Sequence, residues 1–319
     1  MGRRERCLRA AACQTHRVDD SSAGRLTDLL ARLWPGRSCE WRPLAGGITN
    51  RNFLVDVEGE RYVLRMAGKD THLLGIDRRA EAAAARMAAA VGVGPEVVAA
   101  LEGEGCLVTR FIDGSPIPAE RMREQPVIAA VATSLAAIHA GSPLPSRFDV
   151  HEVVARYART ASEFGVRLPE PYAWAAGTSE RIRAARGTQP VVPCHNDLLN
   201  ANFIDDGTRL WIVDWEYAGM GDPMFDLGNF SVKHDFGIDQ DEALLTAYAG
   251  RARSFDVASI RLMRFMGAFF EAMWGVVQQG VSELDVDFAA YAADNFDRLR
   301  AIAADPRFEE WLERAAAGT

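Results

Sequence analysis

Three side chains in one stretch of the chain have the types and the spacing that transfer of a phosphoryl group requires. Asp197 and Asn202 lie five residues apart, and Asp214 follows an apolar run over residues 210–213 that predicts a short buried strand. This chemistry needs a carboxylate that orients and deprotonates a hydroxyl, together with hard oxygen ligands for Mg²⁺. A loop with Asp197 and Asn202 that faces a strand end with Asp214 supplies all three groups.

The same gap between Asp and Asn occurs in the catalytic loop of protein kinases, within the pattern His-x-Asp-x-x-x-x-Asn. His195 stands two residues before Asp197, so the whole pattern is present here. Each piece alone has an ordinary structural explanation, because an Asp in a loop or after a strand often only forms a turn. Together and in this order they predict kinase-type chemistry, with Asp197 as base and with Asn202 and Asp214 as Mg²⁺ ligands.

Two further motifs extend this pattern, Ile-Val-Asp-Trp-Glu-Tyr-Ala-Gly over 212–219 and Gly-Asp-Pro-Met-Phe-Asp-Leu-Gly over 221–228. With the loop motif they resemble the choline/ethanolamine kinase and aminoglycoside phosphotransferase superfamily, over roughly residues 40–300 and most closely its bacterial choline kinases. The resemblance implies a protein-kinase-like α+β fold of two lobes, with an antiparallel sheet and a helix in the first and mainly helices in the second. It also implies ATP and Mg²⁺ as cofactors and a small molecule as phosphoryl acceptor.

Composition and charge restrict the class of protein. The 319 residues suffice for two lobes, and 48% hydrophobic with 25% charged residues is typical of a globular chain. A net charge of −8 argues against a nucleic-acid partner. An acidic site would favour a cationic small substrate, but the net charge does not place its excess of carboxylates at the site. No apolar run approaches the ~20 residues of a membrane span. The five scattered cysteines predict no disulfide framework, and Cys7, Cys13 and His16 form no complete metal site. We therefore expect a cytoplasmic protein.

The chain divides into an N-terminal tail over 1–23, a nucleotide-binding lobe over 24–113 and a catalytic and substrate-binding lobe over 114–319. The first residues are Arg-rich without an apolar core, so a disordered tail is favoured over a secretory signal. In the first lobe the patterns predict helices over 26–34 and 78–91 and strands over 39–44, 52–57, 61–66, 96–101 and 106–111.

The adjacent glycines Gly46 and Gly47 lie in the predicted turn between the first two strands. Glycines let backbone amides approach a phosphate without a Cβ clash, although Gly-Gly equally marks an ordinary hairpin. The stretch resembles the Gly-Gly-x-Thr-Asn loop of choline kinases, which implies that Thr49 and Asn50 also belong to the nucleotide site.

Arg65 ends the third predicted strand at the position where protein kinases have a lysine. Its predicted partner is Glu81 in the following helix, and the pair would place a cation on the nucleotide phosphates. A solvated surface pair of little energetic value is the alternative. Farther along, residues 108–114 resemble the linker between the lobes, so backbone groups of Arg110, Phe111 and Ile112 are expected to meet the adenine.

The second lobe is predicted to be mostly helical, with helices over 127–139, 151–164, 172–185, 254–279 and 286–303 and a short one at the end. His195 is expected to hold the catalytic loop in shape, and His139 to be structural. Asp222 is predicted to cap a helix that begins at Pro223. From the resemblance, Asp226 is expected to brace the catalytic loop.

Of the predicted site, the sequence specifies least well the residues that bind the phosphoryl acceptor. An aromatic cage with nearby carboxylates would bind a choline-type cation. Candidate rings are those of Tyr217, Phe270 and Trp274, with Glu216 and Glu271 as charges. Bacterial choline kinases tend to have two Trp three apart here, and this chain has Glu271 in place of the first. A carboxylate suits an amine that donates hydrogen bonds, so ethanolamine or another amino alcohol stays open beside choline.

Other functions remain compatible with the sequence. An aminoglycoside or other small-alcohol phosphotransferase would use the same chemistry, although an aromatic acceptor site argues mildly against a polycationic sugar. A non-catalytic nucleotide-binding module is the alternative from a different class, and the presence of all three oxygen-bearing residues argues against it. An all-helical scaffold does not account for the strand-rich first third. Whether the protein is a monomer or a homodimer is left open.

Overall fold

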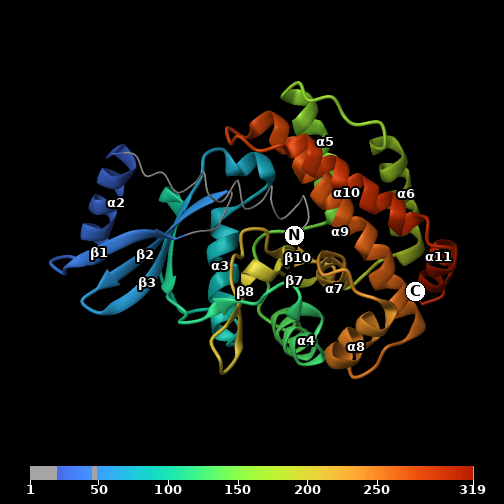
Figure 1. Ribbon diagram of the computed structural model, residues 1–319, viewed down its shortest axis with the longest axis horizontal. Coiled ribbons are helices and arrows are strands. Elements are labelled where there is room, and N and C mark those ends of the chain that lie inside the picture. Colours follow the sequence, from blue (N-terminus) through green and yellow to red (C-terminus); the bar gives the residue numbers. More distant parts are fainter. Residues whose placement is uncertain (1–19, 45–48, 319) are drawn as a thin grey trace.

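The computed structural model describes residues 20–44 and 49–318, and these form two lobes (Figure 1). The first lobe contains a five-stranded antiparallel sheet with the strand order β1-β2-β3-β5-β4. Its strands are β1 (Cys39–Leu44), β2 (Asn50–Val57), β3 (Glu60–Ala67), β4 (Val97–Leu101) and β5 (Cys106–Arg110). This is the protein-kinase-like arrangement expected from the sequence, and the predicted strands all form.

Helix α2 (Asp20–Leu33) packs on this sheet. Leu26, Leu29 and Leu30 recur at helical spacing and are buried against strand residues such as Val55 and Leu64, which are fully buried. The helix begins inside the stretch predicted to be a tail, because Asp20 already lies in its first turn. Residues 1–19, with the Cys7, Cys13 and His16 considered for metal binding, lie outside the described residues.

Helix α3 (Arg78–Ala90) belongs to the first lobe in sequence but packs into the core of the second. Asp77 caps it by accepting from the N–H groups of Arg79 and Ala80. Its buried alanines join a core with residues of the second lobe, such as Leu135 and Phe203, and the Ile212 N–H donates to the Val93 carbonyl at 2.9 Å. Small side chains allow this close approach, so α3 fixes the position of the first lobe against the second.

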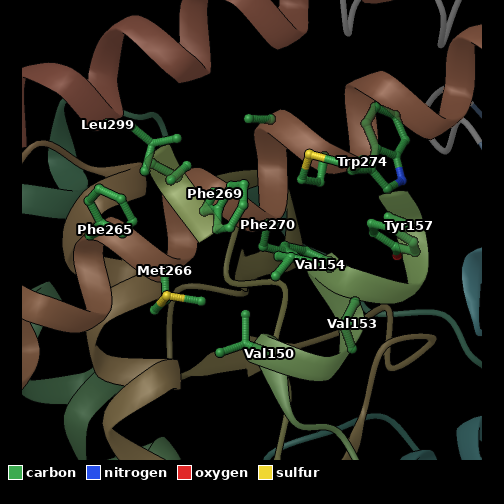
Figure 2. Close-up of a cluster of buried hydrophobic side chains, with 14 of the residues drawn as sticks. Val150, Val153, Val154, Tyr157, Phe265, Met266, Phe269, Phe270, Trp274 and Leu299 are labelled. Carbon is green, nitrogen blue, oxygen red and sulfur yellow. The ribbon is translucent and has the colours of Figure 1, made fainter. Parts of the chain in front are cut away.

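The second lobe is built around the long helix α9 (Ser254–Val281). The other helices are α4 (Gln125–His139), α5 (Val150–Glu163), α6 (Tyr172–Arg186), α7 (Pro223–Lys233), α8 (Ile238–Ala249), α10 (Phe288–Ala303) and α11 (Phe308–Ala316). Figure 2 shows part of the core, in which Val153 and Tyr157 of α5 face Phe270 and Trp274 of α9. Among the described helices, none combines the length and the apolar character needed to cross a bilayer.

Short strands between the lobes carry the motifs. They are β6 (Ser115–Pro116), β7 (Val192–Cys194), β8 (Phe203–Asp205), β9 (Leu210–Ile212) and β10 (Gly219–Gly221). Strand β7 pairs with β10, and β8 lies between β6 and β9. Of these strands only β9 was predicted, from the apolar run that precedes Asp214. Two or three residues are otherwise too few to show a periodic pattern. Helix α8 was also not predicted.

The packing of α7 on α9 generates a stability prediction. A Cβ at Gly228 of α7 would lie 2.6 Å from the Met263 Cβ and 2.8 Å from the Met263 backbone carbonyl carbon of α9. Gly228→Ala should therefore lower the free energy of unfolding by about 1–3 kcal/mol, since the helices must separate. Thermal melting with and without denaturant measures this effect.

The matched control is Gly177→Ala in α6, where a Cβ would meet no atom within 4 Å. This change should leave stability unchanged or raise it by up to about 1 kcal/mol, because alanine favours the helix. Equal melting temperatures for the two variants would show that α7 and α9 are not packed as closely as described.

Candidate active site

The buried carboxylate of Asp226 holds the backbone of the catalytic loop. Its oxygens accept from the N–H of His195 at 2.8 Å and from the N–H of Asn196 at 2.7 Å, and His139 contacts it at 3.1 Å. Asn196 has a φ of 68°, a left-handed conformation that most side chains avoid. The bonds to Asp226 compensate for this strain, so the residue braces the loop as predicted. His139 is structural, through Asp226 and Tyr248.

The His195 ring joins the loop to the strand end. Its Nδ1 accepts from the Asp197 N–H at 3.2 Å, which leaves Nε2 protonated to donate to the Val213 carbonyl at 3.0 Å. The ring also packs on Trp215, with centroids 4.6 Å apart. With both nitrogens engaged, His195 positions its neighbours and is not available as a proton carrier.

Asp197, Asn202 and Asp214 come together around this ring. The Asn202 amide donates to the Asp197 carbonyl at 2.9 Å and lies 3.4 Å from the Asp197 Oδ2, which leaves its Oδ1 available to a ligand. The Val213 N–H donates to the Asn202 carbonyl at 3.0 Å, so Asp214 is held beside Asn202. Asp214 has a φ of 67°, and its side chain is 29% exposed. The oxygens offered here are the hard donors that Mg²⁺ prefers.

Arg65 on β3 connects the two lobes at this point. It forms the predicted ion pair with Glu81, and its Nη1 also lies 2.5 Å from an Asp214 oxygen. The Arg65 side chain is only 10% exposed, so this is not the solvated surface pair considered as the alternative. Arg78 contacts Glu81 at 2.7 Å as well, which completes a buried cluster of cations and carboxylates.

Glu216 contacts the first lobe at the start of β2. It accepts from the Thr49 hydroxyl at 2.6 Å and the Asn50 amide at 2.8 Å, and Arg78 lies 3.5 Å away. Burial, helped by the charge of Asp214, raises the pKa of Glu216 to about 7. This placement argues against the acceptor role expected for Glu216, because its contacts are to the loop of the first lobe. Gly46 and Gly47 lie outside the described residues.

In the predicted adenine-binding stretch, two of the three backbone N–H groups already donate to carbonyls of the protein. The N–H of Arg110 donates to the Glu96 carbonyl and that of Phe111 to the Arg61 carbonyl. The Arg110 side chain pairs with Glu60 at 2.9 Å, and the two side chains are 43% and 51% exposed. No carbonyl within the described residues accepts from the N–H of Ile112, and the adenine-binding role of this stretch stays a prediction.

The predicted cage residues form a packed aromatic group. The Trp274 indole N–H donates to the Tyr217 hydroxyl at 3.0 Å, and these side chains are 8% and 9% exposed. Phe270 is 2% exposed and packs on Tyr157 and Tyr217, with centroids 5.9 and 5.7 Å apart. Phe270 is therefore a core residue that supports Tyr217, which departs from the direct acceptor contact expected of it.

Sequence reasoning missed Lys233, the last residue of α7. Its ammonium lies 2.8 Å from the Asp197 Oδ1 and also contacts Glu271, and its side chain is 1% exposed. Glu271, expected to contact the acceptor, therefore pairs with Lys233. A signal was present, because Asp226, Asn229 and Lys233 recur at helical spacing after the loop. The Asn229 side chain also bonds the loop, accepting from the Leu198 N–H at 3.1 Å.

A second cluster with metal-binding residue types, His139, Cys194 and Asp226, lies behind the loop. Burial raises the pKa of the Cys194 thiol well above its ordinary value, so sulfur is not offered as a thiolate. The Asp226 oxygens already accept the loop bonds described above. The cluster is thus accounted for as the hydrogen-bonded support of the catalytic loop.

Comparison with known proteins agrees with this geometry. Residues 40–263 match the phosphotransferase enzyme family. A choline/ethanolamine kinase family protein from Mesorhizobium loti has a similar structure, with a TM-score of 0.80, 33% identity and coverage of 93% of this chain and 99% of that one. Human ethanolamine kinase 2 is 25% identical over 311 residues, which are 86% of this chain and 78% of the relative.

Choline kinase LicA from Streptococcus pneumoniae shares the fold, with a TM-score of 0.74, 22% identity and coverage of 89% of this chain and 99% of that one. A LicA structure in complex with AMP is similar as well, with a TM-score of 0.70. The family match covers most of the chain, and the Mesorhizobium relative is aligned over nearly its whole length. The chain is therefore a phosphotransferase, and it belongs to the choline/ethanolamine kinase family within the phosphotransferase enzyme family.

Proposed function

We propose that this protein transfers the γ-phosphate of ATP to the hydroxyl of choline, ethanolamine or a related amino alcohol. The observation that carries the proposal is the meeting of Asp197, Asn202 and Asp214 beside the buried Arg65. A base, two oxygen ligands for a metal and a cation for phosphates are the groups that this reaction requires.

Each group has a separate role in this proposal. Asp197 orients the acceptor hydroxyl and takes its proton. Asn202 and Asp214 would hold Mg²⁺, which neutralises phosphate charge when bound. Arg65, kept in place by Glu81, would contact the nucleotide phosphates from strand β3. The Gly46-Gly47 loop with Thr49 and Asn50 would cover the nucleotide, and the stretch from Arg110 to Ile112 would meet its base.

The acceptor assignment has chemical support from the far side of Asp197. Glu271 shares the Lys233 ammonium with the base, and Trp274 follows Glu271 by one helical turn. A carboxylate and aromatic rings beside the base suit an amine linked to an alcohol. The relatives named choline kinase and ethanolamine kinase agree with this class. The same fold occurs in aminoglycoside phosphotransferases, so these sugars belong in the test.

A substrate panel tests the proposal. With Mg²⁺ and ATP, we expect nucleotide turnover with choline or ethanolamine at least tenfold above that with thiamine or an aminoglycoside. Chelation of divalent ions should abolish the turnover, because Asn202 and Asp214 then hold no ion. Turnover is measured as the rate at which ADP forms. Mg²⁺-dependent nucleotide binding without turnover on any alcohol would favour a non-catalytic binding module instead.

Removal of the base gives a second prediction. Asp197→Asn should lower kcat at least 10³-fold while the KM for ATP changes less than about threefold, since the nucleotide contacts other residues. Steady-state kinetics with the best acceptor measure both constants, and circular dichroism checks the fold. Full turnover in Asp197→Asn would show that another group takes the proton.

Trp274 gives a third prediction, on the acceptor side. Trp274→Ala should raise the acceptor KM at least tenfold and the ATP KM less than twofold, because the ring contacts Tyr217, Phe288 and Tyr291 and none of the residues proposed to bind the nucleotide. Trp274→Phe keeps an aromatic face and loses the indole N–H that bonds Tyr217, so its effect should be smaller. Equal increases in both constants would indicate a general packing defect, for which the buried position of Trp274 gives a physical reason.

A further inference from the structure

Lys233 is the cation nearest to the proposed base among the described residues. It ends α7, and its ammonium lies 2.8 Å from the Asp197 Oδ1. With the side chain 1% exposed, water does not substitute for this contact. A buried ammonium needs carboxylate partners, and here one of the two partners is the group that must accept a proton.

The two oxygens of Asp197 have different surroundings. Oδ1 faces Lys233, whereas Oδ2 lies 3.4 Å from the amide nitrogen of Asn202, a proposed metal ligand. The transferred phosphoryl group must lie on the metal side. Because Oδ1 is held by Lys233, Oδ2 is the Asp197 oxygen that remains for the acceptor hydroxyl in the proposed reaction.

The ammonium is itself anchored from the other side. It contacts one oxygen of Glu271 on α9, and the other oxygen of Glu271 accepts from the Tyr291 hydroxyl on α10. Tyr291 packs edge-on against Trp274, with centroids 5.6 Å apart. The position of the proposed base is thus coupled through Lys233 to α9, which carries Glu271 and Trp274, and to Tyr291 of α10.

The residue type is informative in this chain. Of 36 basic residues, only Lys69 and Lys233 are lysines, and the rest are arginines. Lys69 is on the surface, with a side chain 83% exposed. An ammonium is a compact charge with three donors, whereas a guanidinium is a planar fork that requires more space. Lys233 therefore places one compact positive charge between the carboxylates of Asp197 and Glu271.

We propose that Lys233 is the positioning residue of this kinase, whose ammonium fixes the orientation of Asp197 from the anchor formed by Glu271 and Tyr291. This inference rests on the proposed role of Asp197 as the base. It assigns to Glu271 the task of holding the lysine, in addition to any contact with the acceptor.

The experiment must separate positioning from simple stabilisation. Lys233→Met alone would leave Asp197 and Glu271 close together without a counter-charge, and the protein would lose stability for that reason. The informative comparison is therefore between Glu271→Gln and the double variant Lys233→Met/Glu271→Gln. Both lack the Glu271 charge, and only the double variant lacks the ammonium on Asp197.

We expect kcat of the double variant to be at least 10²-fold lower than that of Glu271→Gln, because a base displaced by about 1 Å loses this much. The KM values for ATP and acceptor should agree within about threefold between the two variants, and so should Mg²⁺-nucleotide affinity. Equal kcat values would overturn the proposal, because Lys233 would then contribute only to folding. Lys69→Met, which removes the surface lysine, is the matched control and should retain wild-type kcat.

A second measurement, on the individual lysine side chains, tests the proposal even if the double variant does not fold. With two lysines, side-chain NMR of protein labelled at lysine gives two assignable signals, and Lys69→Met identifies each. Asp197→Asn should shift the Lys233 signal and leave that of Lys69 in place. An unshifted Lys233 signal would overturn the proposal. Failure of the proposed function is recognised separately, as absence of alcohol turnover in the wild-type protein.

Discussion

The active site depends on the bonds between one buried carboxylate and the backbone of the catalytic loop. Asp226 accepts from the N–H groups of His195 and Asn196, and these bonds hold the loop where Asn196 adopts its left-handed conformation. Two more residues on the same face of α7 continue the contact, Asn229 with the Leu198 N–H and Lys233 with the Asp197 side chain. Helix α7 thus determines the course of the loop and the direction of the Asp197 side chain.

The first lobe meets this loop through charges. Arg65 reaches from β3 to Asp214, and Glu216 reaches back to Thr49 and Asn50. Arg65 and Glu216 are themselves buried, so each requires its partners, and loss of a partner leaves it unsatisfied. The alanine-rich helix α3 adds an apolar contact between the lobes. Thr49, Asn50 and Arg65 of the first lobe are therefore held in one arrangement with Asp214 and Glu216 of the second.

Much of this could be predicted from the sequence, for physical reasons that differ between residues. Strand β1 occupies the residues expected from its pattern, and the cap at Asp222 forms because an Asp before Pro223 satisfies a free N–H. The pair of Arg65 with Glu81 follows from the order of strand and helix. Strands β7 and β10 could not be predicted, because each has three residues and acquires its partner only through the fold.

The sequence alone determined the reaction class, since the types and spacing of Asp197, Asn202 and Asp214 suit few other chemistries. Only the tertiary structure decided which other side chains contact these three residues. Glu216 and Glu271 are both acidic residues near aromatic ones in sequence, yet one faces the Thr49 side and the other holds Lys233. Periodicity along the chain reports which face of a helix is buried, whereas a contact between elements depends on how their buried faces pack against each other.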